Sequence, residues 1–219
     1  RPNDVRENLS WGSLPNVILN VDLEDMVKES GTITRPSDGK EAKSVAFLQC
    51  GVCPGGGDHS YCSSICCMNA LKQAMYVREA SDEGKAFLFY EFMRTPGLYE
   101  DFLRTAQDDP GIFLTRGEVT EVTEDGDGGL IVVAKDTMLG EEIEVKADLV
   151  VLATGMVPNA AGDDLAIFTR KDDDGFVLDD LEASVTVAGV ARRPEDVASS
   201  VRDATGAAAR ALVAAGRRA

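Results

Sequence analysis

All five cysteines of this 219-residue chain lie within one short stretch, between positions 50 and 67. They stand at Cys50, Cys53, Cys62, Cys66 and Cys67, on both sides of a glycine run at 55–57. Four thiolates are the ligand set of a cubane iron–sulfur cluster, and a sulfur-rich site selects iron–sulfur clusters or zinc over hard cations. The clustering therefore predicts a metal centre, with one cysteine more than a [4Fe–4S] cluster needs.

These cysteines occupy the turn between a predicted strand and a predicted helix. Residues 44–49 are a short apolar run, and residues 67–80 have helical periodicity. Because Cys67 would be rotated roughly 100° from Cys66 on a regular helix, we expect the helix to begin near Cys66, with Ser63 or Ser64 as its N-cap. The unpaired N–H groups of its first turn would then face an anionic cluster.

The residue types leave other sites open. The glycine run lacks the G-x-G-x-x-G spacing of a dinucleotide-binding turn, so a nucleotide is not expected there. A zinc site, a redox-active Cys50–Cys53 pair and a disulfide framework are the alternatives to a cluster, although zinc favours two separated cysteine pairs. The only histidine, His59, lies in the same turn. We expect it to be a surface residue, with a ligand or proton-relay role as the alternative.

Three stretches around the cysteines, at residues 44–50, 61–68 and 70–79, resemble the A subunit of heterodisulfide reductase and its relatives. Within that family the resemblance is greatest to the A subunit of the quinone-interacting membrane-bound oxidoreductase complex. It implies a thioredoxin-reductase-like fold with FAD and a [4Fe–4S] cluster held by one cysteine and a later Cys-x-x-x-Cys-Cys motif. The implied ligands are Cys50, Cys62, Cys66 and Cys67. Cys53 departs from the family pattern and is an alternative ligand to Cys50.

Composition excludes several classes of function. A hydrophobic content of 44% is enough for an ordinary core. A formal charge of −16 argues against nucleic-acid binding, which needs a basic surface, and favours solubility or a high-salt habitat. The sequence has no apolar run long enough to cross a bilayer, so we expect membrane association only through partner subunits. Clustered cysteines without a secretory signal favour the reducing cytoplasm.

The fold class predicted is α/β, a fragment of a thioredoxin-reductase-like two-domain flavoprotein. Residues 41–158 should form a Rossmann-like central domain that holds the cluster, in which strands 44–49 and 86–90 pair in parallel through a crossover helix. A helix is expected at 98–107. An antiparallel meander of residues 112–114, 118–123, 130–135 and 141–145 then leads to a buried strand at 148–153.

The flanking segments are expected to belong to a FAD domain. Residues 1–40, with a helix candidate at 22–28, should be a linker or the end of that domain, and residues 159–219 should be its returning C-terminal part. In the latter we expect a strand at 185–188 and a helix with Pro194 in its first turn. Its small apolar face would comprise Val197, Val201, Ala204, Ala208 and Leu212. The resemblance implies an upstream Rossmann half, and since the sequence lacks its G-x-G-x-x-G fingerprint and starts without Met, we interpret the chain as a fragment or a processed piece.

The expected FAD contacts come from the resemblance. Residues 153–155, Ala-Thr-Gly, resemble the junction between the domains of flavin oxidoreductases. The implied contacts are Thr154, Gly155, Gly189, Asp196 and Val197, with an ordinary capping helix as the alternative interpretation of the last three. Without the upstream half, we expect the chain to hold FAD weakly or not at all.

Together these features predict an electron-transfer subunit, or a piece of one, of an iron–sulfur flavoprotein oxidoreductase. It would pass electrons between the [4Fe–4S] cluster and FAD in heterodisulfide, sulfur or quinone-linked energy metabolism. Catalysis would require other subunits of a heterodisulfide reductase-like or quinone-interacting complex, and no catalytic residue is expected in the chain itself. The alternative is a zinc-stabilised scaffold that binds partner subunits without redox activity.

Overall fold

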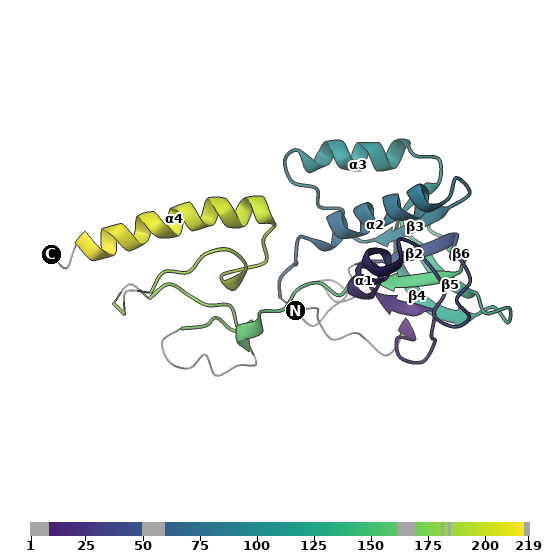
Figure 1. Ribbon diagram of the computed structural model, residues 1–219, viewed down its shortest axis with the longest axis horizontal. Helices are drawn as coiled ribbons and strands as arrows, with labels where there is room; N and C mark the ends of the chain where they lie inside the picture. Colours follow the sequence, from purple (N-terminus) through teal and green to yellow (C-terminus); the bar gives the residue numbers. More distant parts are fainter. Residues whose placement is uncertain (1–8, 50–59, 162–169, 181, 184, 217–219) are drawn as a thin grey trace. The chain divides into compact units, whose positions relative to one another are not determined.

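Figure 1 shows the computed structural model of the protein, which describes residues 9–49, 60–161, 170–180, 182–183 and 185–216. The chain divides into two compact units. The larger unit contains the described residues at 9–49 and 66–154, and the smaller unit contains those at 60–65 and 155–216. The division falls after Thr154, within the Ala-Thr-Gly stretch in which the sequence predicts a junction.

A seven-stranded sheet in the order β1-β7-β2-β3-β4-β5-β6 forms the centre of the larger unit. Its strands are β1 (Val17–Leu19), β2 (Ser44–Leu48), β3 (Lys85–Tyr90), β4 (Ile112–Glu124), β5 (Leu130–Asp136), β6 (Glu142–Ala147) and β7 (Leu149–Leu152). Its helices are α1 (Asn20–Ser30), α2 (Cys66–Ala80) and α3 (Tyr99–Asp108). The strands β1, β7, β2, β3 and the first part of β4 run parallel, whereas β4, β5 and β6 form an antiparallel meander.

The side chains of β2 explain why this sheet is buried on both faces. Val45 and Phe47 pack in a core with the apolar residues of α1, α2 and α3. Ala46 and Leu48 pack in a second core with residues of the meander. Successive residues of a strand point to opposite faces, so the helices cover one face of the parallel strands and the meander covers the other. This α/β arrangement confirms the predicted fold class.

The first part of the predicted meander is wrong. We expected residues 112–114 to be antiparallel, but Ile112–Arg116 pairs in parallel with β3. The helix α3 connects β3 to β4, and a crossover of this kind returns the chain in the same direction. The strand β4 then continues unbroken, with an irregular register between Val119 and Glu121, and pairs antiparallel with β5. One strand thus belongs to both parts of the sheet.

Two elements of the 1–40 segment lie in this unit. Strand β1 pairs in parallel with β7, and Leu23 of α1 is fully buried in the core beneath the helices. The sequence indicated a helix at 22–28 but gave no reason to add a strand to the sheet edge. The predicted domain limits of 1–40, 41–158 and 159–219 stay predictions.

The smaller unit is mostly irregular and ends in α4 (Val197–Gly216), with two short 3-10 helices at Asn159–Ala161 and Gly189–Ala191. Among the described residues the predicted strand at 185–188 is wrong, since only Val185 forms a bridge, with Asp180. Its neighbours bond to side chains instead: the Val187 N–H donates to the Asp179 carboxylate at 2.7 Å, and Arg210 donates to the Val187 carbonyl at 3.0 Å.

Helix α4 begins three residues later than Pro194. The Asp196 carboxylate accepts a hydrogen bond from the Ser199 N–H at 2.6 Å, which caps the helix and fixes its start at Val197. The predicted apolar face is exposed, with Val197 at 82%, Val201 at 64% and Leu212 at 74%. Within the described part of the chain, no helix is both long and apolar enough to cross a membrane.

Candidate metal centre

The carboxyl ends of the parallel strands lie at one edge of the larger unit's sheet, which we name the carboxyl edge. Strand β2 leaves the sheet there, and α2 begins there, because the helix leads back to the start of the parallel strand β3 (Figure 1). Ligands of open α/β sheets bind at this edge. The sequence predicted that the cysteines follow a strand and precede a helix, and the structure confirms the strand and the helix.

Two of the predicted ligands, Cys66 and Cys67, are the first two residues of α2, and both are buried. The Cys67 thiol donates a weak hydrogen bond to the Phe92 carbonyl, with a sulfur–oxygen distance of 3.5 Å. The first turn of α2 contains no acidic residue, so no carboxylate competes for its N–H groups. This helix end can therefore stabilise thiolates through its dipole and its N–H groups.

The predicted N-cap of α2 is wrong. The residue before the helix is Ile65, and the two candidate serines have other partners. The Ser63 hydroxyl accepts a hydrogen bond from the Met156 N–H at 2.7 Å, and the Ser64 hydroxyl donates to the Cys62 carbonyl at 3.4 Å. Ser64 also has a φ of 60°, which is uncommon for a residue other than glycine and marks a tight turn.

Cys62 lies in the smaller unit and is half-buried. Its neighbours fix this segment within that unit. Tyr61 donates from its hydroxyl to the Met156 carbonyl at 2.9 Å, and its ring packs edge-on against Phe176 with the ring centres 5.0 Å apart. The Cys62 sulfur accepts a hydrogen bond from the Ser64 N–H at 3.4 Å, the kind of contact that favours a thiolate.

Cys50, Cys53 and His59 lie outside the described residues. Cys62, Cys66 and Cys67 are not in disulfide bonds. Among the described residues no group of three histidine, cysteine or acidic side chains is close enough to hold a metal ion. The four-cysteine ligand set stays a prediction, as do the alternative roles of Cys53 and His59. The donor chemistry fits a sulfur-ligated centre, because the described cysteines are thiols and two of them stand at a helix N-terminus.

Sequence reasoning missed a buried glutamine at the carboxyl edge. Gln49 directly follows β2, its side chain is 8% exposed, and neither polar atom of its amide has a hydrogen-bond partner among the described residues. An amide of this kind is costly to bury, which indicates a partner that the protein chain itself does not provide. Strand polarity alone could not signal this, because glutamine is ordinary at a strand end.

A second set of buried polar groups ties α1 and α2 to the end of β7. The Thr154 hydroxyl, on a residue only 1% exposed, donates to the Asn20 side-chain oxygen at 3.3 Å. The Gln73 amide, fully buried on α2, donates to the Asn20 carbonyl at 2.8 Å and to Glu24 at 2.9 Å. Thr154 therefore has a structural role, and its predicted contact with FAD stays a prediction.

The other residues predicted to contact FAD lie in the smaller unit. Gly155 and Gly189 both have positive φ, at 69° and 61°, a conformation that favours glycine. The Gly189 N–H donates to the Asp203 carboxylate at 2.9 Å, and this bond, together with nearby Arg192, lowers the pKa of Asp203. Asp196 caps α4, and Val197 is its exposed first residue. These observations match the capping-helix alternative, and contact with FAD stays a prediction at these positions too.

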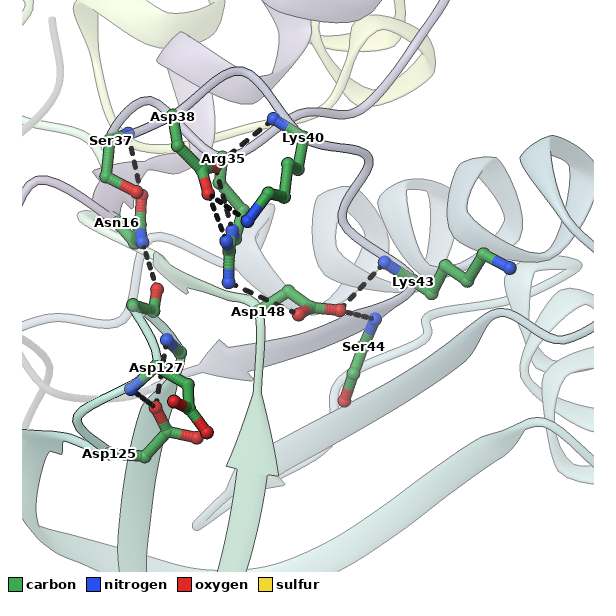
Figure 2. Close-up of polar contacts among 12 residues, drawn as sticks. Asn16, Arg35, Ser37, Asp38, Lys40, Lys43, Ser44, Asp125, Asp127 and Asp148 are labelled. Carbon is green, nitrogen blue, oxygen red and sulfur yellow. Dashed lines mark hydrogen bonds and ion pairs between the residues drawn. The ribbon is translucent and has the colours of Figure 1, made fainter.

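The opposite end of the parallel strands, which we name the amino edge, carries a different polar cluster (Figure 2). Arg35, which is 7% exposed, makes a two-point contact with Asp38 and lies 3.9 Å from the carboxylate of Asp148, just before β7. Asp148 accepts hydrogen bonds from the N–H groups of Lys43 and Ser44 at the start of β2, at 3.0 and 2.9 Å. The contact with Arg35 holds the pKa of Asp38 well below its usual range.

Asn16 completes this cluster. Its amide nitrogen donates to the Gly128 carbonyl at 2.7 Å, and its oxygen accepts from the Ser37 N–H at 3.0 Å. It thereby joins the segment before β1 to the β4–β5 turn and to the loop before β2 (Figure 2). All of these partners belong to the chain, so this cluster stabilises the fold and offers no group for chemistry.

Comparison with known structures shows the fold. The structure resembles thioredoxin reductase from T. acidophilum, with a TM-score of 0.51 and 16% identity over 91% of this chain and 56% of that chain. It also resembles thioredoxin reductase from Lactococcus lactis, with a TM-score of 0.55 and 15% identity over 97% of this chain and 63% of that one. The thioredoxin-reductase-like fold is thereby confirmed.

Comparison of sequences confirms the resemblance inferred from the cysteine motif, although no family model matches the chain. The second iron–sulfur A subunit of CoB–CoM heterodisulfide reductase from Methanopyrus kandleri is 37% identical over 230 residues, which are 95% of this chain and 35% of that protein. The A subunit of the H2:CoB–CoM heterodisulfide, ferredoxin reductase of Methanothermobacter marburgensis is 36% identical over 93% of this chain and 33% of its own length. Greater kinship to the quinone-interacting complex stays a prediction. Over nearly its whole length, the chain is homologous to a segment that makes up about a third of the heterodisulfide reductase A subunit.

Proposed function

We propose that this chain is part of an electron-transferring oxidoreductase subunit that holds a [4Fe–4S] cluster. The observation that carries the proposal is the pair of buried thiols, Cys66 and Cys67, at the N-terminus of a helix that follows a parallel strand, in a chain homologous to subunits named as iron–sulfur reductase subunits. Neither the homology nor the buried thiols alone would specify a cluster.

In this proposal Cys50, Cys62, Cys66 and Cys67 bind the iron atoms, with Cys53 as the alternative to Cys50. The N–H groups of the first turn of α2 partly neutralise the thiolates and thereby favour the negatively charged centre. The cluster would supply one-electron transfer, to or from FAD. The chain itself contributes ligation, burial and adjustment of the reduction potential, and substrate chemistry belongs to other parts of the assembly.

We propose further that the chain acts within a heterodisulfide reductase-like or quinone-interacting complex. The relatives are named as subunits of heterodisulfide reductases, which supports a multi-subunit assembly. The chain spans only about a third of the length of these relatives, so the binding of FAD would need elements from the rest of the protein. We expect this chain by itself to bind added FAD weakly or not at all, and stoichiometric, tight flavin absorbance after FAD addition would contradict that expectation.

Anaerobic purification followed by metal analysis tests the cluster. The proposal predicts a brown protein with about four iron atoms and about four acid-labile sulfides per chain. A colourless protein with one zinc and neither iron nor sulfide would overturn it, and would favour the zinc-stabilised scaffold instead. Electron paramagnetic resonance of the reduced protein distinguishes a cubane from adventitious iron, because only a cluster gives a reducible, spin-coupled signal.

A further inference from the structure

The unpartnered amide of Gln49 is the polar group of the larger unit that the proposed ligands leave unexplained. The side chain is 8% exposed, and both its nitrogen and its oxygen lack hydrogen-bond partners among the described residues. Buried side-chain amides are nearly always hydrogen-bonded in folded proteins, and an exception points to a bound group. The question is therefore which group would lie against Gln49.

The register of the sheet determines the face on which Gln49 stands. Its backbone N–H donates to the Phe89 carbonyl at 2.9 Å, so the parallel ladder continues one residue beyond the end of β2. Val45 and Phe47 belong to the core beneath the helices, whereas Ala46 and Leu48 belong to the other core. Since side chains alternate along a strand, Gln49 lies on the helix-covered face.

That face also carries Cys66 and Cys67. Helix α2 packs its buried residues Ala70, Leu71, Ala74 and Val77 into the core that contains Phe47. Its first turn lies at the carboxyl edge, since the helix runs back from that edge to the start of β3. Gln49 is therefore on the same face and at the same edge as the two buried thiols, and it directly precedes Cys50 in the sequence.

A second buried glutamine in the same unit shows how the fold treats such a side chain when its role is structural. Gln73 is fully buried on α2, and its amide nitrogen donates to the Asn20 carbonyl and to Glu24. Its amide oxygen is unpartnered among the described residues, but both hydrogens of its nitrogen have acceptors. Gln49 has neither kind of contact there, so a role in joining helices does not account for it.

We propose that the Gln49 side-chain N–H group donates a hydrogen bond to a sulfur atom of the cluster and raises its reduction potential. The inference rests on the proposed function, because it requires the cluster to be present. Reduction adds negative charge to the cluster, and an N–H donor stabilises the more negative state. Gln49 binds no iron in this account; it positions a donor and thereby tunes the potential.

Potentiometric titration of the cluster, followed by electron paramagnetic resonance, tests the inference in the full chain. We expect Gln49→Leu to retain iron and to have a midpoint potential more negative than that of the wild type. Gln49→Glu should be more negative still, because a carboxylate removes the donor and adds charge. The matched control is Gln73→Met, which removes a buried amide of the same unit and should leave the potential unchanged while lowering the melting temperature.

A measurement on the cluster-free protein separates tuning from structure. Since the amide has no partner in the described part of the chain, cluster-free Gln49→Leu should melt at the same temperature as the cluster-free wild type or higher. A lower melting temperature, or failure to fold, would overturn the inference by showing that the amide has a structural partner. A loaded Gln49→Leu with the wild-type potential would also overturn it and leave the proposed function standing. A wild type without iron and sulfide would overturn both.

Discussion

The two edges of the parallel sheet carry buried polar side chains that the chain satisfies to different degrees. At the amino edge, Arg35 and Asn16 bond to carboxylates, carbonyls and an N–H group of the chain (Figure 2). At the carboxyl edge, Gln49 is buried without a partner among the described residues, and two buried thiols begin α2. The first edge is complete as a folded structure, whereas the second has the character of a site that a bound group completes. Changes at the two edges should therefore have different consequences.

The largest effect is expected from the thiols of the carboxyl edge. Cys66→Ala should abolish the cluster, because a cubane with three thiolates loses affinity, and soluble yield should fall as well since cluster binding contributes folding free energy. The same holds for Cys62 and Cys67. The measurement is iron and acid-labile sulfide per chain after anaerobic purification.

Cys53→Ala is the matched control. It should retain iron in part or in full, because Cys50 and Cys53 are alternative ligands in our proposal. Full iron retention in Cys66→Ala would contradict the ligand assignment, and equal loss in all five single variants would show that the surplus cysteine has been misread.

A smaller effect, on stability alone, is expected at the amino edge. Asn16→Leu leaves the Gly128 carbonyl and the Ser37 N–H without their partner in a buried setting. We expect a loss of about 1–3 kcal/mol in the free energy of unfolding, the usual cost of an unsatisfied buried group. Chemical denaturation measures it. If cluster content per folded chain fell along with stability, the two edges would not be independent.

The smallest effect is a pH dependence at the same edge. The bonds from Arg35 lower the pKa of Asp38 in the folded state, so the unfolded chain binds more protons in mild acid and the stabilisation is lost as the pH falls below the ordinary carboxyl range of about 4. Asp38→Asn should therefore melt below the wild type at neutral pH, with the difference narrowing in acid.

Lys40→Met is the control for that pH dependence. Its ammonium group lies 3.1 Å from Asp38 but the side chain is 73% exposed, and exposed ion pairs contribute little to stability. We expect no measurable change in melting temperature at either pH. A wild-type melting curve that ran parallel to that of Asp38→Asn at every pH would contradict the assigned role of Asp38.

The sequence predicted those elements that have strong local patterns. The strand at 44–48 and the helix at 66–80 were expected because an apolar run and a helical period flank the cysteines. The meander was mostly expected from alternating residues and the turn at 124–129. The direction of Ile112–Arg116 was missed, because a strand's partner is set by the crossover before it and not by its own residues.

The misses at the site have a similar cause. The strand expected at 185–188 has β-forming residues, but its backbone groups bond to Asp179 and Arg210, which lie elsewhere in the sequence. Ser63 has the position of a cap, yet Met156 takes its hydroxyl. Gln49 and the Arg35 cluster became visible only through burial and partners. Local patterns therefore predict elements and ligand chemistry, whereas the use of each polar side chain depends on tertiary contacts.

Hydrogen exchange of the cluster-free and the cluster-loaded chain, compared by mass spectrometry, tests the contrast between the two edges most directly. We predict that loading slows exchange in peptides that contain Gln49 and the first turn of α2, and leaves unchanged the peptides of the amino edge around Arg35 and the β4–β5 turn. Slower exchange at the amino edge alone, or no change at α2 in a chain that contains iron and sulfide, would contradict the account.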